Sequence, residues 1–346
     1  MRLSACTAAA LATMLLMASP LPCHAQDDVA SFYKGKQISL QVGSDAGGEY
    51  DVVARTVARH MSKHIPGQPT IVVQNVTGAG GLKLLNQLYA VGARDGTVIG
   101  AGISGTPTGA LLTPGVAKFD PRHFGWLGSA GIDTFLVVTT DKARVRTLDE
   151  LYSNELIIGG SASGSASVDF PTVANAILGT KFKIISGYPA ASAIVKLAMP
   201  AGEVEGCSVY TLSSLKSLHE RDWKEGRIRI FAQWGTKINP EIADVPIFPL
   251  GKTEADRQLF ELLYARQNYG RPYMVPPGVP PARLAALRGA FSAVFGDPAF
   301  RAEAEKLKLD LSHIGADEIN ALTERVMATP PAVVARIQSL LPGGGQ

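Results

Sequence analysis

Three glycine-rich stretches have residue types and spacing that suit ligand binding or catalysis. They read GSDAGG at residues 43–48, TGAGG at 77–81 and GGSASGS at 159–165. Each lies between a strand-like apolar run and a run with helical periodicity. Glycine ahead of a helix lets the backbone approach a ligand and present N–H groups to it, and helix N-termini favour anions. The stretches therefore predict a site for a nucleotide phosphate, an attacked carbonyl or a carboxylate.

The glycine spacing excludes three common sites. A dinucleotide fingerprint needs G-x-G-x-x-G after the first strand, but Gly78 and Gly80 follow the second strand and Lys83 replaces the third glycine. GAGGLKL lacks the Gly-Lys-Ser/Thr of a phosphate-binding loop, and GGSASGSAS places Ala162 where a hydrolase elbow needs serine. No nucleophile is indicated, and a carboxylate fits what remains.

A carboxylate can receive donors from both halves of the chain. Hydrogen bonds from helix starts to an ionised group contribute about 1.5–3 kcal/mol each, so a few of them offset much of the cost of association. The hydroxyls of Ser161, Ser163 and Ser165 can add donors from the third stretch.

Other polar side chains near the stretches have simpler interpretations. Asp51 is expected to brace the first loop or cap the following helix. Asp45 and Glu49 are expected to face solvent or to meet an amino group of the ligand. His60 and His64, four residues apart, can share a helix face as metal ligands do, but two exposed histidines near a helix end are the favoured interpretation, because no third ligand is indicated.

Strand-like and helix-like runs alternate along the chain. Strand-like runs at 38–42, 70–76 and 97–104 alternate with helix-like runs at 51–61 and 82–91. A second series runs through 156–161, 170–178, 182–186, 191–199, 206–210, 211–223 and 227–234. Such alternation predicts parallel sheets with helices on their faces.

The last hundred residues predict helices at 254–267, 281–295, 300–308 and 317–327, with no new strands. These helices must pack on an existing sheet, so the chain is expected to leave a first lobe near 124–133 and to return near 234–245. The predicted architecture is α/β, with two lobes that close like a clamshell, each a mainly parallel sheet flanked by helices. The predicted boundaries are 26–130 and 238–346 for a discontinuous first lobe and 131–237 for the second.

The first 25 residues have the pattern of a signal peptide, with one charged side chain, an apolar run at 8–17 and a small residue, Ala25, before the expected cleavage. Two of the three cysteines fall in this leader, so the mature chain keeps only Cys207, a predicted core residue, and forms no internal disulfide. An exported protein without disulfides suits a bacterial periplasm. The net charge of +3 gives no argument for nucleic acid.

Taken together, these features resemble the Bug family of substrate-binding proteins, the extracytoplasmic receptors of tripartite tricarboxylate transporters. The matching runs are Gly47-Gly48-x-x-Asp51-x-x-Ala54-Arg55, Gly67-Gln68, Asn75-x-x-Gly78-Ala79-Gly80-Gly81, Asp95-Gly96-x-Val98-Ile99, Gly160-Ser161-x-Ser163-Gly164-Ser165, Asp244-Val245-Pro246 and Pro277-Gly278-Val279-Pro280. They cover essentially the whole mature chain. Gly43-Ser44 replaces the family's usual Pro-Phe, Thr77 its proline, and GYPAA at 187–191 its Tyr-Lys-Gly, which leaves the ligand's identity open.

The resemblance implies a two-lobed periplasmic-binding-protein fold, similar to type II, in which backbone N–H groups and ordered water hold a ligand carboxylate. Carried onto this chain, the ligand-binding positions are Ser44, Asp45, Ala46, Gly47, Gly48, Thr77, Gly78, Ala79, Gly80, Ser104, Ser161, Ser163, Gly164, Ser165 and Tyr188. No catalysis, cofactor or metal is implied.

We therefore expect a monomeric periplasmic receptor that captures a small organic carboxylate and delivers it to membrane transporter subunits. It is not expected to be an enzyme or to bind nucleic acid. Two alternatives remain open: an exported hydrolase that uses the serine-rich loop at 160–165, and a receptor that acts through a membrane sensor. The sequence also leaves open whether the ligand carries an amino group or an aromatic ring, and whether His60 and His64 bind metal.

Overall fold

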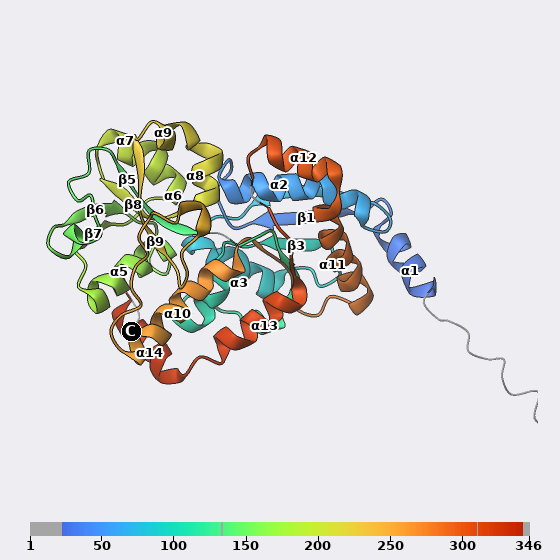
Figure 1. Cartoon of the computed structure of the whole chain (residues 1–346). Coiled ribbons are helices and arrows are strands. Elements are labelled where there is room, and N and C mark those ends of the chain that lie inside the picture. Colours follow the sequence, from blue (N-terminus) through green and yellow to red (C-terminus); the bar gives the residue numbers. More distant parts are fainter. Residues whose placement is uncertain (1–22, 133, 310, 342–346) are drawn as a thin grey trace, which may run out of the picture.

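The computed structural model describes residues 23–132, 134–309 and 311–341, which contain two sheets (Figure 1). The first sheet has the strand order β11-β4-β10-β3-β1-β2 and the second β7-β6-β8-β5-β9. The strands are β1 (Gln37–Val42), β2 (Thr70–Asn75), β3 (Val98–Ala101), β4 (Gly125–Ser129), β5 (Phe135–Thr140), β6 (Leu156–Gly159), β7 (Phe182–Ile185), β8 (Gly206–Thr211), β9 (Ile228–Trp234), β10 (Pro272–Val275) and β11 (Ile314–Gly315).

Helices cover both faces of the two sheets. They are α1 (Cys23–Tyr33), α2 (Glu49–Met61), α3 (Leu82–Val91), α4 (Gly109–Leu112), α5 (Ala166–Leu178), α6 (Ala191–Ala193), α7 (Met199–Ala201), α8 (Leu212–Leu218), α9 (Glu220–Lys224), α10 (Glu254–Tyr269), α11 (Pro281–Gly296), α12 (Pro298–Lys306), α13 (Ala316–Met327) and α14 (Pro331–Leu340). A π-helical turn, Ile194–Ala198, joins α6 to α7.

The first sheet is parallel where the sequence alternates and antiparallel where the tail enters it. β1 pairs in parallel with β2 and β3, whereas β10 pairs antiparallel with both β3 and β4. The predicted α/β class with two sheets flanked by helices is therefore confirmed, although both sheets are mixed and not mainly parallel. The expectation of a tail without strands is wrong. The proline-rich stretch at 271–281 contains β10, which lies fully buried between its neighbours.

The second sheet follows the same plan. β6 pairs in parallel with β7 and β8, and β5 is the reversed strand, antiparallel to β8 and β9. Helix α5 begins four residues before the predicted start and continues through Pro171. Proline has no N–H to donate to the carbonyl of Ser167 one turn earlier. The hydroxyl of Ser208 in β8 donates to that carbonyl instead, at 2.5 Å, and so ties the helix to the sheet.

Apolar side chains at helical and strand spacing build the cores. Alternate residues of β1 are buried, and Val53, Val57 and Met61 of α2 pack on the same side of the first sheet, as their spacing predicts. A larger cluster lies on the opposite face of the first sheet. It contains side chains of α3, α5, α10 and α13 together with Trp234 of β9. Cys207 is fully buried in β8, which confirms its predicted place in the core.

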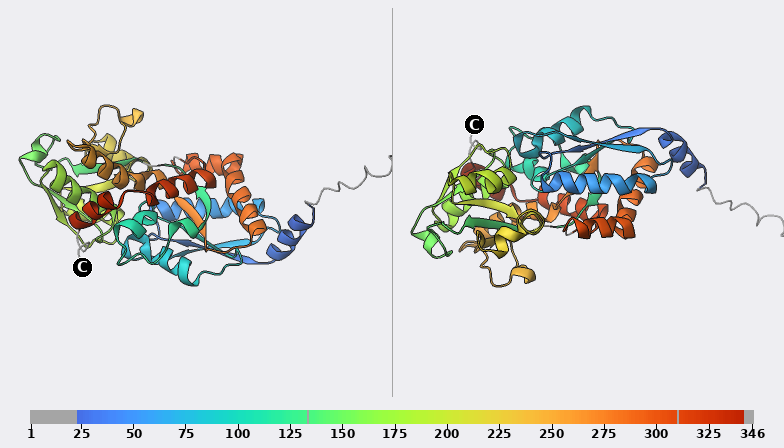
Figure 2. Two further views of the ribbon diagram at one scale, coloured as in Figure 1. Left: turned by 90° about the horizontal axis from the view of Figure 1, so that it is seen from below. Right: turned by 90° about the horizontal axis from the view of Figure 1, so that it is seen from above.

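The two lobes lie side by side, and α1 lies at the end of the first lobe that is far from the second (Figure 2). Helices α10 and α14 contact α5 of the second lobe, so the last hundred residues contribute to both cores. The boundaries near 130 and 238 stay a prediction. Among the described residues, no helix has the length and apolar character needed to cross a bilayer. The predicted leader lies outside the described residues, apart from 23–25.

Candidate ligand-binding site

A cavity of about 420 Å³ lies between the two lobes. The first lobe lines it with the segments that follow β1, β2 and β3, and the second lobe with those that follow β6, β7 and β8. These segments leave the carboxyl ends of parallel strands, where α/β proteins commonly bind ligands. We call this space the interlobe cavity.

Most of the predicted ligand-binding residues line the interlobe cavity. They are Ser44, Asp45, Gly48, Thr77, Gly78, Ala79, Gly80, Ser104, Ser161, Gly164, Ser165 and Tyr188. Ala46, Gly47 and Ser163 do not line it. Sequence reasoning missed further lining residues, among them Glu49, Tyr50, Phe135, Tyr210 and Ser214. The side chain of Phe135 comes from a buried strand, and its position at the cavity has no sequence signal.

The loop at 77–81 has an unusual backbone. Four consecutive residues, Gly78 to Gly81, have positive φ angles of 133°, 49°, 60° and 92°. The second of them is Ala79, and a non-glycine residue in this region stores about 1–3 kcal/mol of strain, which is typical of functional sites. A Cβ on Gly81 would lie 2.7 Å from Thr106 Cγ2, so only glycine fits there.

This loop also presents free donors. The backbone N–H groups from Thr77 to Gly80 donate to no acceptor within the described part of the chain. They precede α3, whose N-terminus carries partial positive charge. A Cβ built on Gly80 would lie 3.5 Å from Cβ of Ser165, so this loop directly faces the start of α5 in the other lobe.

The first loop is braced by Asp51, as expected. Its carboxylate accepts the N–H of Gly47 at 2.9 Å, Arg55 Nε at 2.9 Å and Asn75 Nδ2 at 2.9 Å. Asn75 also donates to the carbonyl of Ser44. Burial alone would raise the pKa of Asp51, but the hydrogen bonds from Arg55, Gly47 and Asn75 together lower it below its usual value. The N–H of Gly47 therefore serves the loop and not a ligand.

The serine-rich loop is braced in a similar way by Asp169 in α5. The N–H of Gly164 donates to Asp169 at 3.2 Å, and the N–H of Ser161 donates to the hydroxyl of Ser167 at 3.0 Å. The hydroxyls of Ser165 and Ser167 pair with each other at 3.0 Å. The N–H groups of Ser161 and Gly164 therefore serve the loop, whereas the first two N–H groups of α5 have no acceptor within the helix. Donation to a ligand by the hydroxyls of this loop stays a prediction.

Asp169 is in turn held from outside the loop. Arg266 of α10 donates to it at 2.8 Å, and both side chains are almost fully buried. Arg266 also donates to the hydroxyl of Thr108, which belongs to the first lobe, at 3.2 Å. This buried ion pair joins the serine-rich loop to α10 and to the first lobe.

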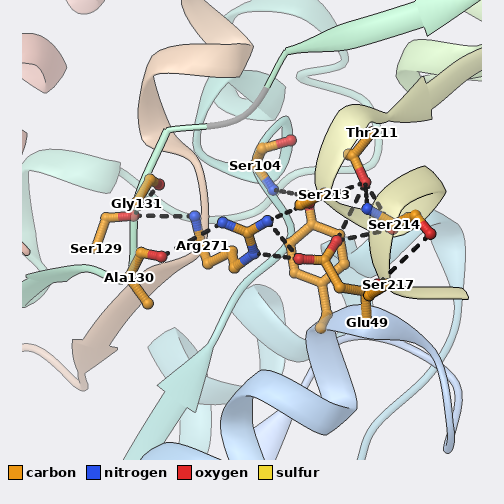
Figure 3. A network of polar contacts seen from close by, with 11 residues as sticks. Glu49, Ser104, Ser129, Ala130, Gly131, Thr211, Ser213, Ser214, Ser217 and Arg271 are labelled. Atoms are coloured by element: carbon orange, nitrogen blue, oxygen red, sulfur yellow. Dashed lines mark hydrogen bonds and ion pairs between the residues drawn. The ribbon is translucent and has the colours of Figure 1, made fainter. Parts of the chain in front are cut away.

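Glu49 is the centre of a second network that spans the lobes (Figure 3). Its Oε1 accepts Arg271 Nε at 2.7 Å, and its Oε2 accepts the hydroxyls of Thr211 at 3.1 Å and Ser214 at 2.8 Å. Arg271 also donates to the hydroxyl of Ser213. The expectation that Glu49 faces solvent or a ligand amine is wrong, because a guanidinium from the same chain neutralises it. No sequence signal links two residues that lie 222 positions apart.

A buried hydroxyl at the interlobe cavity lacks a partner. The Oγ of Ser44 makes no hydrogen bond to any described residue. Unpaired buried polar groups are costly, so such an atom commonly marks a place for a ligand or water.

The two histidines lie on the far side of α2 and contact acidic residues, contrary to the expectation that they are exposed. His60 Nε2 lies 2.7 Å from Glu303, and His64 Nε2 lies 3.3 Å from Asp297. The acids belong to α12 and to its N-cap, so these contacts fasten α2 and the 3-10 turn that follows it, Ser62–His64, to α12. No group of three His, Cys, Asp or Glu side chains in the described residues has the arrangement of a metal site.

Comparisons with known proteins give matches among solved structures. No family model and no curated protein matches the sequence. The periplasmic binding protein BugD is 19% identical with a TM-score of 0.67, over 89% of this chain and 98% of BugD. MatC from Rhodopseudomonas palustris with bound malate is 18% identical with a TM-score of 0.65, over 86% and 99% of the two chains. The R. palustris protein Rpa4515 with adipate is 19% identical with a TM-score of 0.63, over 88% and 96%.

The chain has the fold of these periplasmic binding proteins. The fold implied by the sequence motifs is thereby confirmed over nearly the whole length of the three structures. In this binding-protein fold, the interlobe cavity lies where the two lobes approach each other, between the loops at 77–81 and 160–165.

Proposed function

We propose that this chain is a periplasmic solute-binding receptor of the Bug type. It captures a small organic carboxylate between its lobes and delivers it to a membrane transporter of the tripartite tricarboxylate type. One observation carries the proposal: a strained loop with free N–H groups, Thr77 to Gly80, lies at the interlobe cavity and faces the start of α5. Malate bound to MatC and adipate bound to Rpa4515 support a carboxylate ligand.

Three further features support the proposal. The cavity volume lies within the usual range for small-molecule sites, about 300–1,000 Å³. The hydroxyls of Ser165 and Ser167 pair with each other, so neither is paired with a base that would activate it. The leader pattern and the absence of a mature disulfide support export to the periplasm.

The substrate class is tested by calorimetry and thermal shift on the exported form of the chain. The panel contains dicarboxylates, tricarboxylates, aromatic acids, straight-chain monocarboxylates and amino acids. We expect at least one carboxylate to bind with saturable heat and to raise the melting temperature. A panel without any binding carboxylate would contradict the proposal.

Delivery to a transporter is tested separately in cells. Uptake of the same carboxylate, radiolabelled, is compared in cells that lack the chain and in cells that express it again. We expect uptake to fall without the chain and to recover with it. Uptake that does not depend on the chain would favour a sensory role.

A further inference from the structure

The charges around the interlobe cavity are unusual for a site that takes an anion. Among the described residues that line it, the charged side chains are Asp45 and Glu49, both acidic, and no lysine, arginine or histidine lines it. Arg271 neutralises Glu49 from behind (Figure 3). A second anionic group on the ligand would therefore meet no cation among the described lining residues.

Free backbone donors from both lobes lie close together. The N–H groups of the 77–80 loop belong to the first lobe, and those of Ala166 and Ser167 begin α5 in the second. The Cβ position of Gly80 lies 3.5 Å from Ser165, the N-cap of α5, so the loop lies directly against the start of this helix. Two adjacent helix N-termini can offer donors to the same anion.

The rest of the wall is mainly apolar. Leu82 and Ile103 come from the first lobe, and Phe135, Val209 and Leu218 from the second. The cavity volume of about 420 Å³ is far larger than a carboxylate group needs, so a ligand body has room there. Burial of an apolar body against such a wall is favourable, whereas burial of an unpaired charge is strongly unfavourable.

The acids at the cavity do not offer a good ammonium site. Both carboxylate oxygens of Glu49 already accept hydrogen bonds, from Arg271 on one side and from Thr211 and Ser214 on the other. Asp45 is only partly buried, and ion pairs with partly exposed acids contribute little.

We propose that the interlobe cavity selects a ligand with one carboxylate and an uncharged, mainly apolar body. This inference rests on the carboxylate-binding function proposed above and narrows it. The carboxylate lies between the 77–80 loop and the start of α5, and the body packs against the apolar wall.

Two matched ligand series test this selection by calorimetry. The first is hexanoate, adipate and 6-aminohexanoate, which differ in a terminal methyl, carboxylate or ammonium group. The second is benzoate, terephthalate and 4-(aminomethyl)benzoate. We expect the monocarboxylate of at least one series to bind at least tenfold more tightly than both of its charged partners. Tighter binding of the dicarboxylate or the ammonium compound in both series would overturn the inference but leave carboxylate capture intact.

If no member of either series binds, this inference is rejected, and the broader panel then decides whether carboxylate capture itself survives. A variant pair checks the electrostatic cause. Ser192 lines the cavity from the second lobe and is partly exposed, so it tolerates a longer side chain. Ser192→Lys should raise the affinity for adipate relative to hexanoate at least tenfold compared with the uncharged control Ser192→Gln. An unchanged ratio would overturn the charge argument.

Discussion

At the scale of single residues, the proposed carboxylate binding depends on the backbone of the 77–81 loop. Gly80 has a φ of 60° and lies directly against Ser165, so a methyl group there would occupy the space between the 77–80 loop and the start of α5. Gly80→Ala is expected to weaken carboxylate binding more than tenfold, about 1.4 kcal/mol. The positive φ also adds a stability cost of about 1–2 kcal/mol. Calorimetry and chemical denaturation measure the two effects.

Gly179 supplies a matched control for this variant. It has a φ of 79° at the C-cap of α5, and nothing lies within 4 Å of its Cβ position. Gly179→Ala should therefore show a similar loss of stability with unchanged affinity. If Gly80→Ala binds the carboxylate as tightly as Gly179→Ala does, Gly80 serves only the backbone conformation of its loop and not the ligand.

The contribution of Asp51 to the free energy of unfolding depends on pH. Asp51→Asn removes a buried, ion-paired acceptor and should lower the free energy of unfolding by about 1.5–3 kcal/mol at pH 7. Because folding lowers the pKa of Asp51, its contribution is complete above the unfolded value of about 3.9 and is lost as pH falls through the folded value. Urea unfolding should therefore show a difference between wild type and variant that shrinks at acidic pH. A difference that stays constant down to pH 2 would contradict this role.

Residues near one another in sequence were predictable, and distant partners were not. Asp51 was assigned to its own loop because an acid at a helix start can accept free N–H groups nearby. Glu49 was misassigned, because its neutralising partner Arg271 comes from the tail. Most of the glycine and serine positions at the cavity follow from motif spacing, but Phe135, Val209 and Tyr210 reach it through the tertiary fold.

At the scale of elements, Arg271 at the start of β10 and Glu49 at the start of α2 form a buried pair that reaches β8 and α8 (Figure 3). Glu49→Gln leaves the guanidinium buried without a counter-charge and should destabilise the protein by about 3–5 kcal/mol in urea unfolding. Replacement of both partners, Glu49→Gln with Arg271→Met, should recover part of this loss, because the unpaired charge is gone.

An exposed ion pair serves as the control for that series. Arg257 of α10 pairs with Glu254 and Glu261 at the surface. Arg257→Ala should change the free energy of unfolding by less than about 0.5 kcal/mol. A loss for Glu49→Gln no larger than this would show that the network does not hold the lobes together.

The elements themselves were predictable where the pattern is local and repeated. The alternating runs give β1, α2, β2, α3 and the second series because each has its own periodicity. β10 was not predicted, because a strand of four residues beside several prolines shows no periodic pattern of apolar residues. The strand exists only through its pairing with β3 and β4. α5 starts early because Ser208 replaces the hydrogen bond that Pro171 cannot make.

At the scale of the whole molecule, the interlobe cavity lies between two lobes that each have their own sheet, an arrangement that predicts a hinge motion on ligand binding. Small-angle scattering should show a smaller radius of gyration when the protein is saturated with a carboxylate than when it is free. Superimposable curves under conditions where calorimetry shows saturation would contradict closure.

In the proposed complex, backbone N–H groups at residues 77–80 hold the ligand's carboxylate. The most direct measurement follows the backbone amide resonances of ¹⁵N-labelled protein while the tightest-binding carboxylate of the panel is added. The amides from Thr77 to Gly80 should shift with the same saturation curve as the calorimetric heat, while those of the surface helix α9 stay in place. Full saturation without any shift at residues 77–80 would place the carboxylate elsewhere and contradict its binding by these N–H groups.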